Sequence, residues 1–493
     1  MPINEPAGTA VLLTICGILL VVSVLSSRAS QRIGVPIALF FLLLGMLAGS
    51  EGIGRIPFDD YRLAFRIGSV ALALILFDGG LNTPVDVVRR VWAPAGVLAS
   101  LGVLLIAGLV AGLARLGGLD WPAALVLGAI VSSTDAAATF AVLRASGLQL
   151  KRRVAATLEV ESGVNDPAAV ILTTTLTQNL LRPGELGLAE IVGGVVTHLL
   201  LGALVGIAAG YAGRGLMARL QLATGGLYPA LMIGFGFLSF GVGTLVGGSG
   251  FLAVYLTGIV LGNGPLPYRA GLFRIIDALA WLSQIGMFLL LGLLVYPSRL
   301  TPMVELGLGI ALLLAILIRP LVVAICLIPF RYPWAERLFI GWVGLRGAVP
   351  IVLATFPVLV GAPGADRIFH LVFFIVVVGA IIPGGTVAWT TRRLGLESLQ
   401  PPAPHALLAI ESRVPLEGVL TPFYIDEALV VCGLQLDELD FPEGASVVLI
   451  VRGDRLVAPK GTTRLEPGDH VYVIAQDEDR PFIQLMFGRP EEE

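Results

Sequence analysis

Several side chains that could hold a cation or a proton lie close together in one apolar stretch. Glu159, Glu161 and Asp166 interrupt a segment that is otherwise apolar enough to span a membrane. An ionised carboxylate near a bilayer centre costs at least about 2.5–3.5 kcal/mol, so it needs a partner, a bound ion or a proton. Residues four apart share a helix face, which places Ser162 with Asp166 and Asn165 with Glu161. These residue types predict a site that exchanges a cation for a proton.

The composition predicts the kind of protein that must position this site. Of the 493 residues, 56% are hydrophobic and 14% are charged, whereas soluble domains carry about 25% charged residues. The chain through Arg393 holds 25 Lys and Arg against 17 Asp and Glu, while the last hundred residues hold 7 against 18. We therefore expect an all-α polytopic membrane domain at 1–393, followed by an acidic soluble domain.

The apolar pattern predicts thirteen membrane spans, since about twenty apolar residues cross a bilayer core. They are 7–27, 33–50, 65–85, 91–114, 121–143, 154–181, 190–213, 222–243, 247–266, 276–297, 304–330, 338–361 and 367–391. No charged residue occurs between Arg219 and Arg269. One helix over this run would be about 70 Å long, so we expect a break at the glycine cluster 247–250.

The basic residues predict the orientation of the spans. One alternate set of loops holds 16 Lys and Arg and the opposite set holds 7. Basic loops remain in the cytoplasm. The odd number of spans then places the N-terminus outside and the C-terminal domain in the cytoplasm.

Two spans carry residues that could interrupt a helix. Ser132, Ser133, Thr134 and Asp135 lie in the second half of span five. Thr355 and Pro357 lie in the second half of span twelve. These two spans run in opposite directions, which favours an inverted-repeat transporter with two crossed discontinuous helices. The alternative is two ordinary kinked helices, because such residues are tolerated in membrane helices.

Two arginines are predicted within the membrane, and one of them should neutralise Glu161. Counted from the cytoplasmic helix ends, Arg346 matches the depth of Glu161, whereas Arg319 lies nearer the depth of Asp166. Asp78 is a further intramembrane carboxylate, beside two glycines that admit a close neighbour. Its alternative role is that of a helix-end carboxylate reaching interfacial water.

The sequence gives little support to an enzyme or to a resident metal. The three cysteines form no CxxC pair, and the four histidines have no HExxH spacing. We expect no cofactor, no catalytic residue and no nucleic-acid partner. The ligands of a monovalent cation would instead be hard oxygens from Asp166, Thr134 and Ser162.

The C-terminal part predicts a short linker and a small β-rich domain. Prolines at 401, 402 and 404 indicate a stiff linker over 394–405. Short apolar runs at 428–431, 446–451 and 471–474 alternate with turn sequences, which predicts strands within 406–480. Residues 481–493 are expected to form an acidic tail.

Three motifs give the chain a family resemblance. Residues 132–136 (SSTDA), 161–168 (ESGVNDPA) and 344–350 (GLRGAVP) resemble the monovalent cation/proton antiporter family, in the sodium/proton exchanger branch and of the NhaP type. The resemblance implies two inverted repeats, a homodimer, and a bacterial inner-membrane location within lipid.

The resemblance also implies roles for the candidate residues. Asp166 would carry the cation or the proton. Thr134, Asp135 and Ser162 would supply further oxygens or supporting contacts. The position of Glu161 implies an ion pair with a membrane arginine, and the resemblance favours Arg319, so the choice between Arg319 and Arg346 stays open. Asp78 would line the cytoplasmic approach, where the family often has Glu.

The tail resembles a known regulatory lobe. Residues 439–445 (LDFPEGA) and 459–469 (PKGTTRLEPGD) are similar to the C-terminal lobe of regulator-of-potassium-conductance domains, called TrkA-C. No GxGxxG follows a strand, so NAD binding is not expected, although a small-molecule regulator fits such a lobe. Because potassium/proton antiporters of this type can carry the tail, the resemblance favours K⁺ over Na⁺.

These observations predict a mechanism. Asn165 is neutral, so Asp166 offers one negative charge, which balances either one proton or one monovalent cation. We therefore expect electroneutral 1:1 exchange. Two other classes remain open: a gated cation channel, which would pass current, and an ion-sensing membrane protein, which would bind the ion without moving it.

Overall fold

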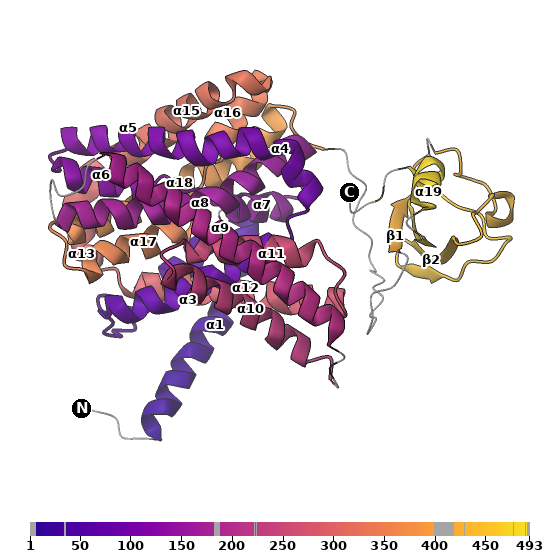
Figure 1. Ribbon diagram of the computed structural model, residues 1–493, viewed down its shortest axis with the longest axis horizontal. Helices are drawn as coiled ribbons and strands as arrows, with labels where there is room; N and C mark the ends of the chain where they lie inside the picture. The colour runs from indigo at the N-terminus through magenta and orange to yellow at the C-terminus, as the bar shows by residue number, and fades with distance from the viewer. Residues whose placement is uncertain are drawn as a thin grey trace. The chain divides into compact units, whose positions relative to one another are not determined.

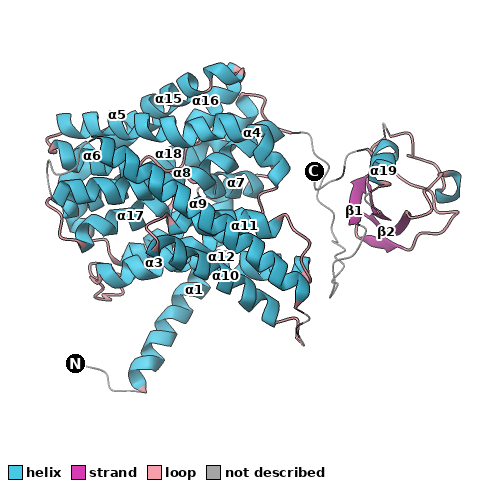
Figure 2. Cartoon of the chain, viewed as in Figure 1, coloured by secondary structure: helices cyan, strands magenta, loops and turns pink. Residues whose placement is uncertain are grey.

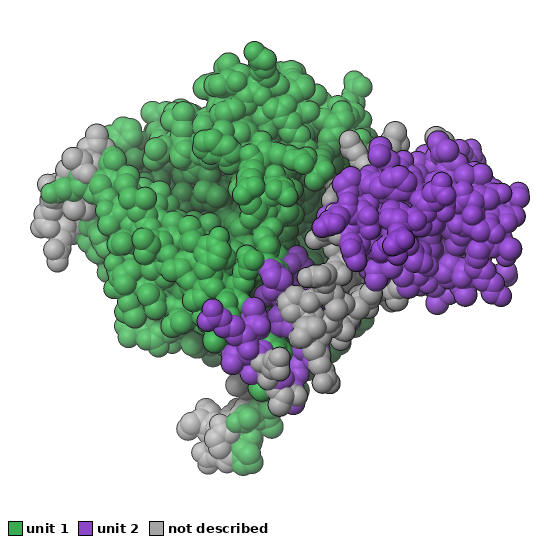
Figure 3. Space-filling view, turned by 45° about the vertical axis from the view of Figure 1, so that its right-hand side comes forward, with its two compact units in different colours: residues 1–216, 226–264, 275–398 green, residues 217–225, 265–274, 399–493 purple. Residues whose placement is uncertain are grey.

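A computed structural model describes residues 6–33, 36–181, 188–220, 222, 224–398, 419–427, 429–476, 478–488 and 490. The chain forms two compact units, coloured separately in Figure 3: residues 1–216, 226–264 and 275–398, and residues 217–225, 265–274 and 399–493. Of the predicted linker at 394–405, residues 394–398 belong to the first unit, and 399–405 lie outside the described residues.

The first unit is built almost entirely of helices (Figure 1, Figure 2). Its helices, with the last turns of α9 and the first turns of α12 assigned to the second unit, are α1 (Ala7–Ile33), α2 (Ile37–Ala48), α3 (Tyr61–Leu81), α4 (Val85–Val97), η1 (Leu98–Gly102), α5 (Val103–Leu116), α6 (Trp121–Ile130), α7 (Ala136–Ala145), α8 (Arg152–Leu181), α9 (Leu188–Arg219), α10 (Leu227–Leu245), α11 (Gly250–Gly262), α12 (Arg269–Leu293), α13 (Pro297–Leu300), η2 (Thr301–Met303), α14 (Val304–Leu313), η3 (Leu314–Ile318), α15 (Arg319–Cys326), η4 (Ile328–Phe330), α16 (Trp334–Trp342), α17 (Ala348–Leu359) and α18 (Ala365–Arg393).

The helices follow the predicted spans. In the described part of the chain, eight helical stretches are long and apolar enough to cross a membrane, and five apolar helices are shorter. Each predicted span coincides with one helix or with consecutive helices. The break predicted at 247–250 is confirmed: α10 ends at Leu245, Gly247 has a φ of +80°, and the Ser249 side chain caps α11.

Two sets of three spans share one order of features. Spans four and eleven each contain a five-residue π turn, η1 and η3. Spans five and twelve are each interrupted, between α6 and α7 and between α16 and α17. A long helix follows each interrupted span, α8 in one set and α18 in the other. The recurrence supports the predicted internal repeat.

The position of the second break was predicted wrongly. Thr355 and Pro357 lie within α17, and the interruption is at 343–347, at the sequence VGLRG. Pro357 lies inside α17, where its missing N–H removes one helical hydrogen bond, to the Leu353 carbonyl oxygen, and the helix continues to Leu359. The break occurs instead where a glycine lets the chain approach its crossing partner: a Cβ on Gly347 would lie 2.1 Å from Asp135 Oδ2.

Small residues bring α3 and α11 together at backbone distance. A Cβ on Gly80 would lie 2.3 Å from the Tyr255 carbonyl oxygen, and one on Gly258 would lie 2.6 Å from the Phe77 carbonyl oxygen. Membrane helices commonly use small residues for such close packing. As a result, the end of α3 lies beside the middle of α11, which positions two polar side chains described below.

The C-terminal domain has a four-stranded antiparallel sheet in the order β1-β4-β2-β3. The strands are β1 (Val419–Tyr424), β2 (Ser446–Arg452), β3 (Arg455–Val457) and β4 (Asp469–Ala475), and the 3₁₀ turn η5 (Leu436–Glu438) and the helix α19 (Arg480–Phe487) complete the domain. The predicted strands at 446–451 and 471–474 are confirmed.

Two expectations about this domain are wrong. Residues 429–431 form no strand; the edge strand beside β4 is instead β1 at 419–424. Residues 481–487 are not part of an acidic tail: Ile483 and Phe487 of α19 are buried in the domain core. Ile483 and Phe487 are four residues apart and share one face of α19, so this apolar face packs in the core although acidic residues surround the helix in the sequence.

Candidate functional site

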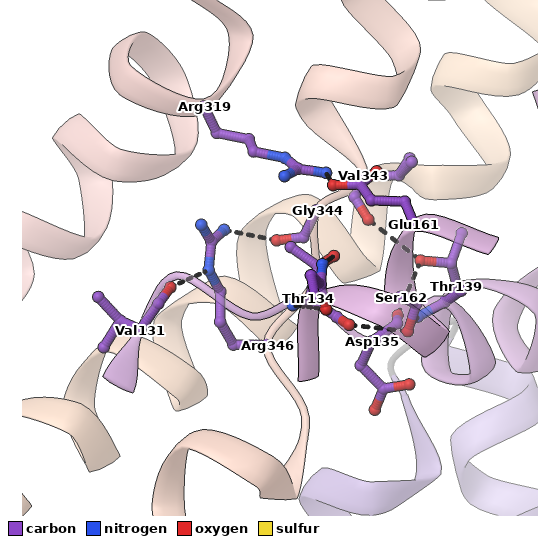
Figure 4. A network of polar contacts seen from close by, with 12 residues as sticks. Val131, Thr134, Asp135, Thr139, Glu161, Ser162, Arg319, Val343, Gly344 and Arg346 are labelled. Atoms are coloured by element: carbon purple, nitrogen blue, oxygen red, sulfur yellow. Dashed lines mark hydrogen bonds and ion pairs between the residues drawn. The ribbon is translucent and has the colours of Figure 1, made fainter. Parts of the chain in front are cut away.

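The two interrupted helices cross at their breaks and bind each other there (Figure 4). Asp135 N donates to the Leu345 carbonyl oxygen at 2.7 Å, and Thr139 Oγ1 donates to the Val343 carbonyl oxygen at 3.1 Å. Arg346 Nε donates to the Val131 carbonyl oxygen at 3.3 Å. From residue 131 to residue 139 in the first segment, the partners run backwards from 346 to 343 in the second. The two segments are therefore antiparallel. This is the crossing expected of two inverted repeats.

Charged side chains compensate the helix ends that meet at this crossing. Arg346 donates to the carbonyl oxygen of Val131, the C-cap residue of α6, and to that of Gly344, in the break that follows α16. Asp135 caps α7 by accepting from Ala138 N at 3.0 Å. Helix C-terminal ends carry partial negative charge and N-terminal ends carry partial positive charge. Arg346 and Asp135 therefore stabilise the broken segments inside the membrane.

Two residues of α8 bind the first break. Ser162 Oγ donates to the Thr134 carbonyl oxygen at 2.8 Å and accepts from Ala136 N at 3.2 Å. Asn165 Nδ2 donates to Thr134 Oγ1 at 2.7 Å. Thr134, Ser162 and Asn165, predicted from separate motifs, are thus brought together. Because these hydrogen bonds hold α8 against the break, the neighbouring α8 residue Asp166 also lies at the break.

Asp166 has unused hydrogen-bonding capacity. Its side chain is 7% exposed, and within the described chain Oδ1 has no hydrogen-bond partner. Ser133 lies beside this carboxyl, and its Oγ likewise has no partner in the described residues. Buried polar atoms are normally paired, so each exception requires an explanation. Sequence reasoning noticed Ser133 only as part of the break and did not assign it to the site.

Glu161 is paired with Arg319. Arg319 Nη2 lies 2.7 Å from Glu161 Oε1, and both side chains are at most 2% exposed. The depth count, which favoured Arg346, is wrong because the interrupted helix places Arg346 against the carbonyl oxygens of the crossing. The π turn η3 immediately precedes Arg319 and shifts the register of span eleven at that point.

A cavity of about 630 Å³ reaches the crossing. Five of its lining residues carry carboxylates and one, Arg144, is basic. The carboxylates are Asp78, Asp135, Glu159, Asp166 and Asp277. Thr83, Tyr255 and Gln284 add neutral polar groups that sequence reasoning missed, because they come from three segments far apart in the sequence: the loop after α3, α11 and α12. Such an acidic cavity concentrates cations.

The chain is similar to known membrane transporters over most of its length. Residues 15–393 match the family model for the transmembrane domain of sodium/hydrogen exchangers, and residues 423–481 match the model for the TrkA-C domain. The chain is 40% identical over 480 residues to the K(+)/H(+) antiporter NhaP2 of Shewanella oneidensis, covering 96% of this chain and 83% of the relative. It is 40% identical over 476 residues to the K(+)/H(+) antiporter NhaP of Alkalimonas amylolytica, covering 96% and 82%.

A solved structure has a similar fold. The sodium proton antiporter MjNhaP1 of Methanocaldococcus jannaschii, determined at pH 8, superposes with a TM-score of 0.67 at 24% identity. The match covers 78% of this chain and 99% of that one.

Proposed function

Since the chain belongs to the sodium/hydrogen exchanger family and is a multi-pass cation/proton antiporter, we propose that it exchanges K⁺ for H⁺ one for one at Asp166. The family predicted from the three motifs is thereby confirmed. Na⁺ is the second candidate cation. We propose the bacterial inner membrane as the location, with the N-terminus outside, the C-terminal domain in the cytoplasm, and a homodimer as the assembly.

The unpaired Asp166 carboxyl carries this proposal. A buried carboxylate with an unused oxygen, at the inner end of an acidic cavity, can hold either a proton or a cation. Thr134 and Ser162 lie in the same hydrogen-bonded group and offer hydroxyl oxygens, which hard cations prefer. Glu161 is already balanced by Arg319, and Asn165 is neutral, so of these three α8 residues only Asp166 can alternate in charge.

Two observations support K⁺. Relatives at 40% identity over nearly the whole chain are named K(+)/H(+) antiporters. The tail matches the TrkA-C domain, and potassium/proton antiporters of the type that this chain resembles can carry such a tail. For this domain we propose a small-molecule regulator as the ligand. The 16 to 7 excess of Lys and Arg in one set of loops supports the orientation. The exposed Arg144 and Asn82, which line the cavity, lie in or beside loops of that set.

The test is exchange in inverted membrane vesicles with K⁺, Na⁺ or Li⁺. Asp166→Asn should eliminate cation-dependent proton movement with every cation. Asp120→Asn is the matched control, because its side chain is 93% exposed and lies before α6; it should keep the wild-type rate. Retained exchange in Asp166→Asn would refute the assignment. A wild-type K⁺ rate no higher than the Na⁺ rate would refute the choice of K⁺.

Stoichiometry needs its own measurement. In reconstituted vesicles, an electroneutral exchanger should run at the same rate whether or not a membrane potential is imposed. A rate that follows the imposed potential would refute 1:1 exchange.

A further inference from the structure

We propose that Glu159, Thr83 and Tyr255 form a second monovalent-cation site in the cavity, which the cation occupies on its way to Asp166. The inference rests on the proposed function, because it takes Asp166 as the destination of the cation. It assigns a role to a carboxylate for which the motifs gave none.

Glu159 lies on the same stripe of α8 as Asp166. Seven residues make two helical turns, so the two Cα atoms are separated by about 10 Å along the helix axis. Glu159, Ser162 and Asp166 all line the cavity. A cation entering along this stripe therefore meets Glu159 before Asp166.

Thr83 presents an oxygen to Glu159. Thr83 Oγ1 lies 3.4 Å from Glu159 Oε1, but only 2.6 Å from the Gly79 carbonyl oxygen. A hydroxyl has one proton, and the shorter contact with Gly79 takes it. The lone pairs of Thr83 Oγ1 thus remain available beside the carboxylate, an arrangement that a cation between the two oxygens would stabilise.

Tyr255 supplies the third oxygen and the observation that points to a ligand. Its side chain is 3% exposed, and its hydroxyl has no hydrogen-bond partner in the described part of the chain. A Cβ on Gly163 would lie 2.4 Å from this hydroxyl, so the ring packs directly on the α8 backbone between Glu159 and Asp166. The hydroxyl lies near Thr83 and within electrostatic range of both carboxyls. The close packing of α3 and α11 holds the group together.

The donor set suits an alkali cation. One carboxylate and two neutral hydroxyls are hard oxygens with a single negative charge, which balances one K⁺ or Na⁺. No histidine or cysteine of the described chain lines the cavity, so its donors do not select a soft transition metal. The cation would enter without any proton leaving this site, and the exchange for H⁺ would remain at Asp166.

The experiment measures exchange in reconstituted vesicles against K⁺ concentration for Glu159→Gln and Tyr255→Phe. Each change keeps the side-chain shape and removes one ligand. We expect the apparent KM for K⁺ to rise about tenfold in Glu159→Gln and a few-fold in Tyr255→Phe, with the maximal rate within about twofold of wild type. Glu159 and Tyr255 serve one site, so once Glu159→Gln has removed that site, Tyr255→Phe should raise KM no further. The double variant should therefore have the KM of Glu159→Gln. Unchanged KM in both single variants would overturn the inference.

A matched control separates a site from the general charge of the cavity. Asp277→Asn removes the same charge from the lining, and its effect on KM should vanish when choline chloride raises the ionic strength, because exposed charges are screened. The effect of Glu159→Gln should persist. Equal screening of both effects would overturn the site. If Asp166→Asn retains exchange, the proposed function fails; if it abolishes exchange while Glu159→Gln has no effect, only this inference fails.

Discussion

The buried pair of Glu161 and Arg319 offers the sharpest test of how the membrane domain is held together. The two side chains are at most 2% exposed and their charged atoms lie 2.7 Å apart. With about 4 Å between charge centres and an effective dielectric constant of 20, the attraction is about 4 kcal/mol. Removing one partner leaves the other charge buried and unpaired, a loss of roughly 3–5 kcal/mol.

We therefore expect Arg319→Met and Glu161→Gln each to lower the thermal midpoint of the purified protein sharply and to reduce exchange. The double variant should be more stable than the sum of the two single losses predicts, because it contains no unpaired charge.

The exposed pair of Arg115 and Asp120, whose charged atoms lie 3.8 Å apart, is the control. Asp120→Asn should lower the free energy of unfolding by at most about 1 kcal/mol. Wild-type stability in Arg319→Met, or strictly additive losses in the double variant, would refute the reasoning.

Two further predictions concern the crossing and the loop before α3. Gly347→Ala should abolish most exchange in a folded protein, because the new Cβ would displace the Asp135 carboxyl; Gly385→Ala, whose Cβ would meet no atom within 4 Å, is the control, and equal rates in the two variants would contradict the crossing geometry. The Ser298 hydroxyl and amide donate to Glu51 and lower its pKa below the ordinary 4.5. That contact should therefore be complete above pH 4.5 and be lost as the pH falls through the lower folded-state pKa. Hydrogen exchange of 298–300, corrected for intrinsic rates, should accelerate only at acidic pH. Ser298→Ala keeps the amide donor and should weaken this pH dependence, and Glu51→Gln should remove it.

Much of the membrane domain could be predicted from the sequence because each prediction depends on local patterns. Apolar length predicts a span from the thickness of the bilayer alone. The break at 247–250 follows because one helix cannot be 70 Å long in a membrane. The first interruption follows from the polar run beginning at Ser132. Ser162 and Asn165 reach this break because their spacing from Asp166 places them on neighbouring faces of α8.

Other features could not be read from local patterns. Pro357 is a stronger helix breaker than Gly347, yet α17 continues through it, because the break depends on where Asp135 and the partner chain must approach. The partner of Glu161 could not be chosen by depth, since depth says nothing of the rotation of each helix or of the π turn before Arg319.

The sequence by itself determined the spans, the polar residues of the first break and of α8, and the charge that Asp166 would carry, because hydropathy, spacing and residue type act over a few helical turns. Only the tertiary structure decided that Arg346 binds carbonyl oxygens, that Ser133 lies beside Asp166, and that Thr83 and Tyr255 face Glu159. Those contacts depend on close backbone packing between helices far apart in the chain, and a change of one residue in rotation or register would separate them.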